Sequence, residues 1–212
     1  MKLIGMLDSP YVRRAAISFQ LLKITFEHQS LSVFRGYEEF RKINPVVKAP
    51  SLVCDDGQVL MDSSLIIDYA EALAGNGRSM MPIAVHERQR VLQLTGLALA
   101  ACEKSVSIYY ERDRPAEKVH QPWVDRVTTQ LLAAYRLLED ELRASPLAAS
   151  SAHMNLAGVS AATAWHFTQQ EIPDVVPSSD FPTLRDFSAQ AERLPEFIAA
   201  PHGGGTYRDR RG

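Results

Sequence analysis

The sequence predicts two domains: an α/β domain with the element order βαβαββα, followed by an all-helical domain. Three observations lead to this division. Short apolar runs separated by turn residues fill the first third of the chain, residues 75–79 have a Gly- and Ser-containing linker composition, and every later apolar pattern has helical spacing. We therefore expect domains at 1–76 and 83–202, a linker at 77–82 and a disordered tail at 203–212.

The composition is that of a globular protein with nearly balanced charge. Of the 212 residues, 46% are hydrophobic, and 23 basic residues stand against 25 acidic ones. This balance gives no overall field to attract nucleic acid or an anionic membrane. Cys54 and Cys102 have neither metal-ligand nor Cys-x-x-Cys spacing, which fits a reducing cytoplasm. No signal peptide and no run of about 18 apolar residues is visible, so neither export nor membrane insertion is expected.

The first elements form a βαβ start. Residues 2–7 are an apolar run that ends at Asp-Ser-Pro, as a buried strand stopped by a turn does. A helix should follow, because Ser9 can cap it and Pro10 suits its first turn. Its buried face is formed by apolar residues at helical spacing: Val12, Ala15, Ala16, Phe19 and Leu22. Residues 24–29 then alternate apolar and polar side chains, which indicates a half-buried strand.

A hairpin and a helix complete the first domain. Residues 34–43 are charged and weakly periodic, and indicate a short helix or a loop. Apolar runs at 51–54 and 59–61 flank an Asp-Asp-Gly turn, which predicts two antiparallel strands. Residues 62–64 then offer caps for a helix with an apolar face made of Leu65, Ile66, Tyr69, Ala70 and Leu73.

The second domain is expected to be helical throughout. Residues 86–107 form a long, apolar-rich helix, and Pro115 and Pro122 mark the break before the next one. The clearest helical pattern of the sequence follows, in Val124, Val127, Leu131, Ala134, Leu138 and Leu142. Helices at 157–170 and 182–194 complete the domain.

Three motifs in the first domain resemble the glutathione S-transferase family. Residues 9–13 read Ser-Pro-Tyr-Val-Arg, residues 44–52 read Asn-Pro-Val-Val-Lys-Ala-Pro-Ser-Leu, and Asp-Ser at 62–63 follows an Asp-Gly turn. Their order and spacing are similar to the N-terminal signature of the family, and residues 110–115 resemble a bacterial branch of it. The resemblance implies an α/β thioredoxin-like N-terminal domain (βαβαββα) that binds glutathione, plus an all-α C-terminal helical domain. It also implies a homodimer with a glutathione site in each subunit.

Ser9 is the candidate catalytic residue that the resemblance indicates. Its hydroxyl lies at the expected N-terminus of the first helix, where the helix end and a hydrogen-bond donor both favour the thiolate of glutathione. A thiol with a pKa of about 8.5 is mostly protonated at neutral pH, so the site has to stabilise the ionised form. Ser9 would donate to the sulfur without acting as a nucleophile. Taken without the resemblance, Ser-Pro is more often simply a helix cap.

The resemblance assigns further glutathione contacts to two segments. Pro50 matches the cis-proline of the family, next to which the backbone of Ala49 pairs with the cysteinyl part of the tripeptide; from sequence alone, a trans proline at a sheet edge is the commoner case. Lys48 would approach the glycyl carboxylate, or be a solvated surface lysine. Asp62 suits the γ-glutamyl ammonium and Ser63 its α-carboxylate, although both also suit a helix cap.

Candidates for the second substrate come from the helical domain. Tyr109, Tyr110 and Arg112 fall where the family has this pocket, and they suit an apolar electrophile. Packing of the tyrosines and solvation of Arg112 are the alternatives. Arg13 and Arg35 are weaker candidates for ligand contacts. The six histidines show no metal-ligand spacing, so glutathione is the expected co-substrate and no metal is expected.

The sequence departs from the family at the start of one helix. The family commonly has a Ser/Thr-x-x-Asp capping box there, whereas residues 155–158 read Asn-Leu-Ala-Gly. Asn155 can still cap the helix, but Gly158 returns no carboxylate and lowers helix propensity by about 1 kcal/mol relative to alanine. We therefore expect Gly158→Asp to raise thermal stability.

The leading functional hypothesis is a detoxification-type enzyme that binds glutathione and directs its thiolate at an electrophilic small molecule. An alternative of another class is a non-catalytic glutathione-binding or regulatory scaffold with the same fold. A disulfide reductase with a cysteine at the helix start is a third possibility, and Ser9 disfavours it.

Overall fold

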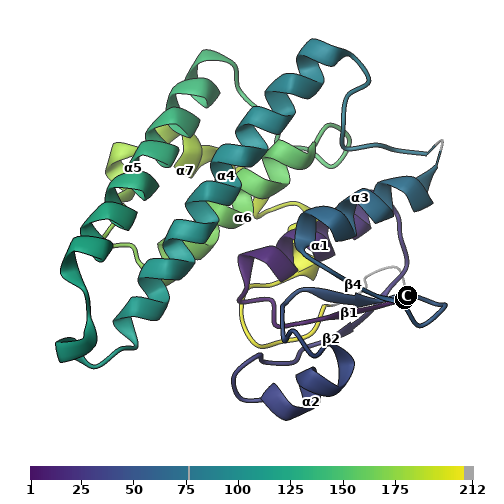
Figure 1. Ribbon diagram of the computed structural model, residues 1–212. Coiled ribbons are helices and arrows are strands. Elements are labelled where there is room, and N and C mark those ends of the chain that lie inside the picture. The colour runs from purple at the N-terminus through teal and green to yellow at the C-terminus, as the bar shows by residue number, and fades with distance from the viewer. Residues whose placement is uncertain (76, 208–212) are drawn as a thin grey trace. The chain divides into compact units, whose positions relative to one another are not determined.

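The computed structural model describes residues 1–75 and 77–207, which fall into two compact units (Figure 1). The first unit comprises Met1–Met80 together with the chain from Arg193 onward, and the second comprises Met81–Glu192. Up to residue 75 the element order is βαβαββα, as predicted. The second unit is entirely helical apart from its connections.

A mixed four-stranded sheet forms the centre of the first unit. Its strand order is β2-β1-β3-β4, where the strands are β1 (Lys2–Ile4), β2 (Glu27–Gln29), β3 (Ser51–Val53) and β4 (Val59–Met61). β1 and β2 are parallel, and the other two pairs are antiparallel, so the predicted hairpin is confirmed. β2 is shorter than the predicted strand at 24–29, because Phe26 packs edge-on against Phe19, with ring centroids 5.2 Å apart, instead of extending the ladder.

Helices cover both faces of this sheet. The two longer helices of the unit, α1 (Pro10–Leu21) and α3 (Ser63–Ala74), pack against each other on one face, and α2 (Tyr37–Ile43) lies on the other (Figure 1). Phe40 of α2 packs against Ile4 of β1. Because strand side chains alternate, the neighbouring Leu3 faces α1 and α3. The unit is therefore a thioredoxin-like α/β domain, and the segment at 34–43 is part loop and part helix.

A short helix near the end of the chain returns to the first unit. This helix, α8 (Pro195–Ala199), contacts α1. Nε of Arg13 donates a hydrogen bond to the carbonyl oxygen of Ala200 at 2.7 Å, immediately after α8. The sequence-based boundaries placed residues up to 202 in the helical domain. The buried arginine explains the difference, since its guanidinium needs acceptors that this returning segment supplies.

The segment that follows α8 lies beside β2. The hydroxyl of Ser30 donates to the carbonyl oxygen of Gly204 at 2.8 Å, and the ring of Tyr207 stacks on Phe26 with centroids 4.6 Å apart. The expectation of a disordered tail is therefore wrong for residues 203–207, because Tyr207 has an aromatic partner. Residues 208–212 of the expected tail lie outside the described residues.

The second unit is a helical bundle. It comprises α4 (Val85–Arg112), α5 (Gln121–Ala144), α6 (Leu156–Glu171) and α7 (Pro182–Ala191), with the 3₁₀ turns η1 (Ala116–Lys118) and η2 (Ser178–Asp180) between them. α4 packs against both α5 and α6. Each predicted helix is present. The observed helix ends differ from the predicted ones by a few residues, because helix termini are the least certain part of a helical pattern.

One helix among the described residues, α4, is long and apolar enough to cross a membrane by length and composition alone. Its apolar side chains Leu94, Ala98 and Ala101 are buried inside the unit. Core helices of globular proteins meet the same criterion, so this feature by itself is weak support for a membrane span.

The start of α6 shows why glycine occupies position 158. Asn155 caps the helix as predicted, accepting a hydrogen bond from the N–H of Gly158 at 2.9 Å. A Cβ atom at this glycine would lie 2.5 Å from the sulfur of Met154 and 3.4 Å from the ring of Phe187. Both side chains are buried. This geometry favours the opposite of the expected stabilisation by Gly158→Asp, because Met154 fills the space that a carboxylate would need.

Candidate functional site

The register of the sheet brings three segments to one edge. Ile4 at the end of β1 pairs with Ser51 at the start of β3, and Ser51 pairs with Met61 at the end of β4. Because both pairs are antiparallel, the loop after β1, the loop before β3 and the residues after β4 leave the sheet at the same edge. Six candidate residues lie on these segments: Ser9, Lys48, Ala49, Pro50, Asp62 and Ser63.

Ser9 occupies the N-cap position of α1 without capping the helix through its side chain. Its backbone holds it in place, since its N–H donates to Met6 and its carbonyl oxygen accepts from Arg13 at 3.0 Å. Among the described residues, the Ser9 hydroxyl has no hydrogen-bond partner. The half-buried hydroxyl is therefore a donor at the positive end of a helix.

The backbone of Ala49 runs beside this loop. The Ala49–Pro50 peptide bond is cis, as the resemblance implies. Within the described part of the chain, neither the N–H nor the carbonyl oxygen of Ala49 makes a hydrogen bond. Gly5 permits the close approach: its φ is 136°, and a Cβ there would lie 2.6 Å from Val12 and 3.1 Å from the Cβ of Ala49. Ala49 thus offers both of its backbone groups to an extended peptide.

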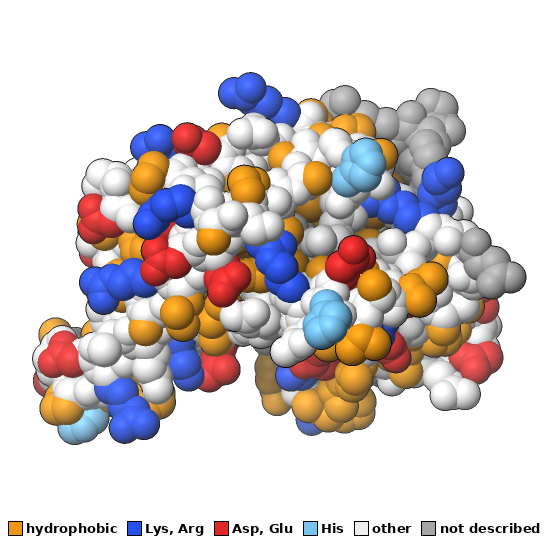
Figure 2. All heavy atoms as spheres, turned by 90° about the horizontal axis from the view of Figure 1, so that it is seen from above, with side chains coloured by type: hydrophobic (Ala, Val, Ile, Leu, Met, Phe, Trp, Pro, Cys, Tyr) orange, Lys and Arg blue, Asp and Glu red, His pale blue; other side chains and the backbone are white. Residues whose placement is uncertain are grey.

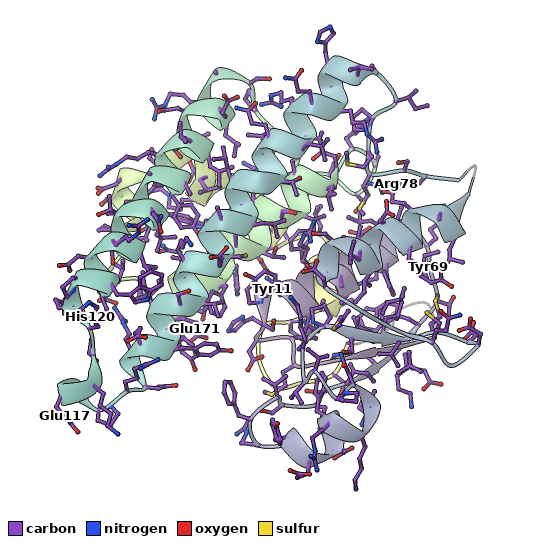
Figure 3. All side chains as sticks on the ribbon, viewed as in Figure 1. Tyr11, Tyr69, Arg78, Glu117, His120 and Glu171 are labelled. Carbon is purple, nitrogen blue, oxygen red and sulfur yellow. The ribbon has the colours of Figure 1, made fainter. Side chains whose placement is uncertain are left out.

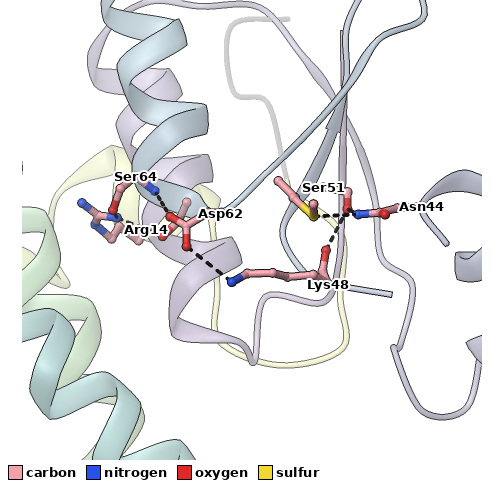
Figure 4. A network of polar contacts seen from close by, with 8 residues as sticks. Arg14, Asn44, Lys48, Ser51, Asp62 and Ser64 are labelled. Carbon is pink, nitrogen blue, oxygen red and sulfur yellow. Dashed lines mark hydrogen bonds and ion pairs between the residues drawn. The ribbon is translucent and has the colours of Figure 1, made fainter. Parts of the chain in front are cut away.

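A buried asparagine fixes the loop that carries Lys48 and Ala49. Nδ2 of Asn44 donates to the hydroxyl of Ser51 at 2.8 Å, and the Ser51 hydroxyl donates to the carbonyl oxygen of Lys48 at 2.7 Å (Figure 4). Oδ1 of Asn44 accepts from the N–H of Val46 at 3.0 Å. The sequence motif at 44–52 predicts no separate role for Asn44; the signal available is its position before proline, which is typical of a turn.

Asp62 connects the start of α3, which it caps, to the loop before β3, where it pairs with Lys48. Its Oδ1 accepts from the N–H of Ser64 at 2.9 Å, so the predicted cap of α3 is present. Its Oδ2 lies 3.5 Å from Nζ of Lys48 (Figure 4). The backbone of Asp62 has a φ of 74°, which non-glycine residues rarely adopt and which concentrates at functional sites.

Ser63, the first residue of α3, contacts an arginine that sequence reasoning missed. Nη1 of Arg14 lies 2.9 Å from the hydroxyl oxygen of Ser63 and 3.1 Å from that of Ser64 (Figure 4). Arg14 is only 1% exposed and Ser63 only 3%. The signal that pointed to it was a pair of arginines inside the otherwise apolar part of α1, since a buried guanidinium requires polar partners.

The two weaker arginine candidates have different surroundings. Arg13 is buried, bonded to Ala200, and its guanidinium carbon lies 5.7 Å from the ring centroid of Phe197, so it anchors α8. Arg35 is exposed on the loop after β2, with Nη2 4.0 Å from the sulfur of Met6 in the loop after β1. Because β2 is parallel to β1, that loop begins at the same sheet edge as the Ser9 loop.

The candidates from the helical domain lie at the end of α4. The ring centroid of Tyr109 is 5.7 Å from that of Tyr110 and 6.1 Å from that of Phe167. Arg112 makes a bidentate ion pair with Asp174, with distances of 3.0 and 2.6 Å. These hydrogen bonds hold the pKa of Asp174 below its ordinary value. The guanidinium of Arg112 is therefore already paired within the second unit.

Both cysteines are buried free thiols. Burial raises the pKa of the Cys54 thiol, although a hydrogen bond with Tyr69 on α3 opposes the effect in part (Figure 3). Cys102 is buried in α4. The sequence interpretation of Cys54 as a core residue agrees with this environment.

Charged side chains of the described residues are mixed in sign on the face shown in Figure 2. Lys and Arg side chains alternate there with Asp and Glu. This distribution matches the near balance of basic and acidic residues in the sequence. An anionic ligand at this protein would therefore depend on local contacts such as those around Asp62 and Ser63.

Comparisons with known proteins agree with this architecture. Residues 3–78 match the family described as glutathione S-transferase, N-terminal domain. The uncharacterised GST-like protein YibF of Escherichia coli K12 is 29% identical over 142 residues, which cover 67% of this chain and 70% of that protein.

Solved structures extend the similarity to the helical unit. A glutathione transferase family member from Pseudomonas fluorescens Pf-5, solved with bound glutathione, is 28% identical, with a TM-score of 0.80 over 95% of this chain and 98% of that one. A glutathione S-transferase from Methylobacillus flagellatus shares the fold at 17% identity, with a TM-score of 0.83 over 94% of this chain and 98% of that one. The N-terminal motifs, the fold of both units and these relatives together make the chain similar to glutathione S-transferases, and residues 3–78 match the N-terminal domain of that family.

Proposed function

We propose that this protein binds glutathione at the sheet edge of its first unit and directs the thiolate at an electrophilic small molecule. The observation that carries the proposal is the convergence of a donor hydroxyl, an unpaired backbone segment and a capped helix start at one edge: Ser9, Ala49 and the pair Asp62 and Ser63. The similar protein from Pseudomonas fluorescens was solved with glutathione bound, which supports the same ligand here.

The chemistry of glutathione matches the groups along this edge. Its γ-glutamyl end carries an ammonium, which suits the Asp62 carboxylate, and an α-carboxylate, which suits Ser63 and the first amides of α3. Its cysteinyl amide suits antiparallel pairing with Ala49. Its glycyl carboxylate suits Lys48, which would exchange its ion pair with Asp62 for one with the ligand.

Ser9 would then donate a hydrogen bond to the sulfur. A thiol with a pKa of about 8.5 is only about 3% ionised at pH 7, and a reduction of two units would make it about three-quarters ionised. The thiol proton leaves to solvent. In a conjugation by substitution, the thiolate sulfur forms a bond to the electrophilic carbon, and the leaving group departs with its bonding electron pair.

We expect the second substrate, the electrophile, to be an apolar small molecule. Tyr109 and Tyr110 at the end of α4 are the candidate contacts for it, and their aromatic rings suit an apolar ligand. Arg112 is a weaker candidate than its sequence position indicated, because two of its three guanidinium nitrogens, Nη1 and Nη2, already bind Asp174.

Two further properties complete the proposal. A homodimer is expected from the family, and the exposed apolar side chains of Met61 on β4 and of Leu65 and Leu73 on α3 are the kind of surface that a second subunit covers. A cytoplasmic location is expected because both cysteines are free thiols. No nucleic acid, membrane or metal is part of the proposed function.

Calorimetric titration with glutathione, combined with a thiolate-absorbance pH titration, tests this proposal. We expect the native protein to bind glutathione and to lower its thiol pKa, and Ser9→Ala to bind with a thiol pKa closer to that of free glutathione. Absence of binding would reject the proposal. Binding with an unshifted thiol pKa in the native protein would instead favour the alternative, a non-catalytic scaffold with the transferase fold.

A further inference from the structure

The last described residues of the chain lie against the loop between β1 and α1. The hydroxyl of Ser30, directly after β2, donates to the carbonyl oxygen of Gly204 at 2.8 Å. Gly204 packs against Met6 of the loop, since a Cβ atom on this glycine would lie 3.2 Å from the terminal methyl carbon of Met6. The carbonyl oxygen of Met6 in turn accepts from the N–H of Ser9 at 3.2 Å. A segment from the opposite end of the chain therefore supports the turn that ends at Ser9.

His28 on β2 connects the same segment to the loop by hydrogen bonds. Its Nδ1 accepts from the N–H of Tyr207 at 2.9 Å, and its Nε2 lies 2.8 Å from the carbonyl oxygen of Gly5. A carbonyl oxygen only accepts, so Nε2 carries the proton and donates to Gly5. The N–H of Gly5 donates to the carbonyl oxygen of Gln29 at 3.0 Å. Both backbone groups of Gly5 are thus held by β2, and this fixes the peptide plane between Gly5 and Met6.

Gly5 is the point at which a displacement of this loop would reach the candidate site. Its φ is 136°, a conformation that glycine adopts as readily as many others, so its partners have to hold it there. A Cβ here would lie 2.6 Å from Val12 on α1 and 3.1 Å from the Cβ of Ala49, so Gly5 fills the space between them. A rotation of the peptide between Gly5 and Met6 would therefore move Ser9 relative to Ala49.

We propose that His28 is a positioning residue for the Ser9 hydroxyl, acting through the carbonyl of Gly5. Tyr207 keeps the imidazole in the required tautomer, because the bond at one ring nitrogen decides which nitrogen carries the proton. The inference rests on the proposed function and adds to it a side chain that controls the thiolate without touching it. Since hydrogen bonds weaken steeply with angle, a small displacement of the loop is enough to weaken the donation from Ser9 to the sulfur.

Two variants of His28 test the proposal. His28→Phe keeps an aromatic ring of similar size and removes both hydrogen bonds, whereas His28→Gln retains one donor and one acceptor. The measurement is the pKa of the glutathione thiol in the complex, obtained from thiolate absorbance against pH. In His28→Phe we expect this pKa to rise toward that of free glutathione, by about half or more of the rise that Ser9→Ala causes. In His28→Gln it should stay at the native value.

A ligand without an ionisable thiol separates this effect from a general loss of binding. Calorimetry compares glutathione with S-methylglutathione, whose sulfur cannot become a thiolate. His28→Phe should weaken glutathione binding several-fold at neutral pH and change the affinity for S-methylglutathione by no more than about twofold. Equal losses for the two ligands would indicate damage to the whole site and would overturn the proposal.

The Ser9→Ala background tests whether the effect passes through Ser9. With the hydroxyl absent, His28→Phe should add little to the thiol pKa, because both changes remove the same interaction. A rise of the same size in both backgrounds, or no rise in the native background, contradicts the proposal.

Two variants of Tyr207 test the role of the end of the chain and leave His28 in place. Tyr207→Pro removes the N–H that binds Nδ1, and Tyr207→Ala keeps this N–H while removing the ring that stacks on Phe26. The thiol pKa should be higher in Tyr207→Pro than in Tyr207→Ala. Equal values would reject the part assigned to the amide of Tyr207.

Hydrogen exchange of the Ser9 amide tests the connection without any ligand. In the free protein, this amide should exchange faster in His28→Phe than in His28→Gln, because its acceptor, Met6, loses support. Equal exchange rates would overturn this inference and leave the proposed function standing. Failure of the native protein to bind glutathione would overturn the proposed function, while the exchange experiment would still decide whether His28 positions Ser9.

Discussion

The backbone N–H of Tyr207 donates a hydrogen bond to Nδ1 of His28 at 2.9 Å. The other ring nitrogen of His28, Nε2, lies 2.8 Å from the carbonyl oxygen of Gly5. Because a carbonyl oxygen only accepts, Nε2 carries the proton and Nδ1 offers its lone pair. The neutral imidazole therefore ties the segment after α8 to both β2 and the loop that follows β1.

Acidification should release Tyr207 from His28. Burial lowers the pKa of His28 below its ordinary value of 6.5, and the hydrogen bond to Gly5 opposes this only in part. A lowered pKa in the folded state means that this contribution to stability is complete above about pH 6.5 and is lost as the pH falls through the folded pKa. We therefore expect the exchange protection factor of the Tyr207 amide to be constant above about pH 6.5 and to fall as the pH is lowered through the folded pKa of His28.

A His28→Gln variant is the control for this prediction. A glutamine amide can donate to Gly5 and accept from Tyr207 without titrating in this range. Its protection factor at Tyr207 should stay constant with pH. A constant protection factor in the native protein would contradict the role of the neutral imidazole.

Glu139 on α5 caps α7 from outside that helix. Its two carboxylate oxygens accept from the amides of Thr183 at 2.9 Å and Leu184 at 2.8 Å. Glu139→Ala should lower the free energy of unfolding by about 3 kcal/mol, because it leaves two amides of a buried helix start without acceptors. Urea denaturation at neutral pH measures this. Asp140→Asn, which changes a neighbouring exposed carboxylate, should stay within about 0.5 kcal/mol.

The Glu139 carboxylate should also make the stability of the protein fall as the pH is lowered. Burial alone would raise the pKa of Glu139, but hydrogen bonds from Leu184 and Thr183 outweigh it, and the pKa lies below its ordinary value. Its contribution to stability should therefore be complete above about pH 4.5 and disappear as the pH falls through the folded value. The native protein and Glu139→Gln should accordingly converge in stability below about pH 4, and a constant difference would contradict this.

Gly158→Asp should lower the melting temperature. The new Cβ would overlap the sulfur of Met154, and the new carboxylate would be placed beside the oxygen of Asn155 that already caps the helix. Overpacking of this kind costs roughly 1–3 kcal/mol, which corresponds to roughly 2–12 °C for a chain of this length. Thermal denaturation followed by circular dichroism measures it. Gly158→Ala should shift the melting temperature in the same direction, and a rise in either variant would show that Met154 can move away.

Lys48→Met should separate ligand binding from stability. The side chains of Lys48 and Asp62 are 51% and 45% exposed, so their ion pair contributes less than about 0.5 kcal/mol to folding. Glutathione affinity should fall several-fold, and its dependence on salt should weaken, because one carboxylate contact is lost. Urea denaturation and calorimetry at two salt concentrations measure the two effects. A large loss of stability with unchanged affinity would contradict the assignment.

Local signals in the sequence were sufficient for the order of the elements. Asp-Ser-Pro at 8–10 and Asp-Asp-Gly at 55–57 each interrupt an apolar pattern, Asn-Pro at 44–45 ends a charged segment, and the structure changes element at each of them. The start of β2 could not be predicted from local signals, because it depends on a contact between residues that are far apart in the sequence. Phe26 continues the alternating pattern, but its ring packs between Phe19 and Tyr207, and the distant tyrosine has no local signature.

The residues of the candidate site could also be predicted only in part from the sequence, because some of their contacts join residues that are far apart along the chain. Ser9, Ala49 and Asp62 were recognised from motifs, and the antiparallel register then explains their convergence. The contact between Arg14 and Ser63 joins residues 49 positions apart and follows no spacing rule. Ser9 is the opposite case. The Ser-Pro sequence is equally typical of a serine that caps a helix with its side chain, and only the structure shows that the Ser9 hydroxyl does not make this capping hydrogen bond.

The return of α8 to α1 also sets an order of events during synthesis. The helical unit, Met81–Glu192, is continuous in sequence, so all of its residues are synthesised before the segment from Arg193 onward is added. The sheet unit begins first but lacks Ala200, the acceptor for the buried Arg13, until nearly the whole chain has emerged. The half of the protein that is translated first is therefore the half that is finished last.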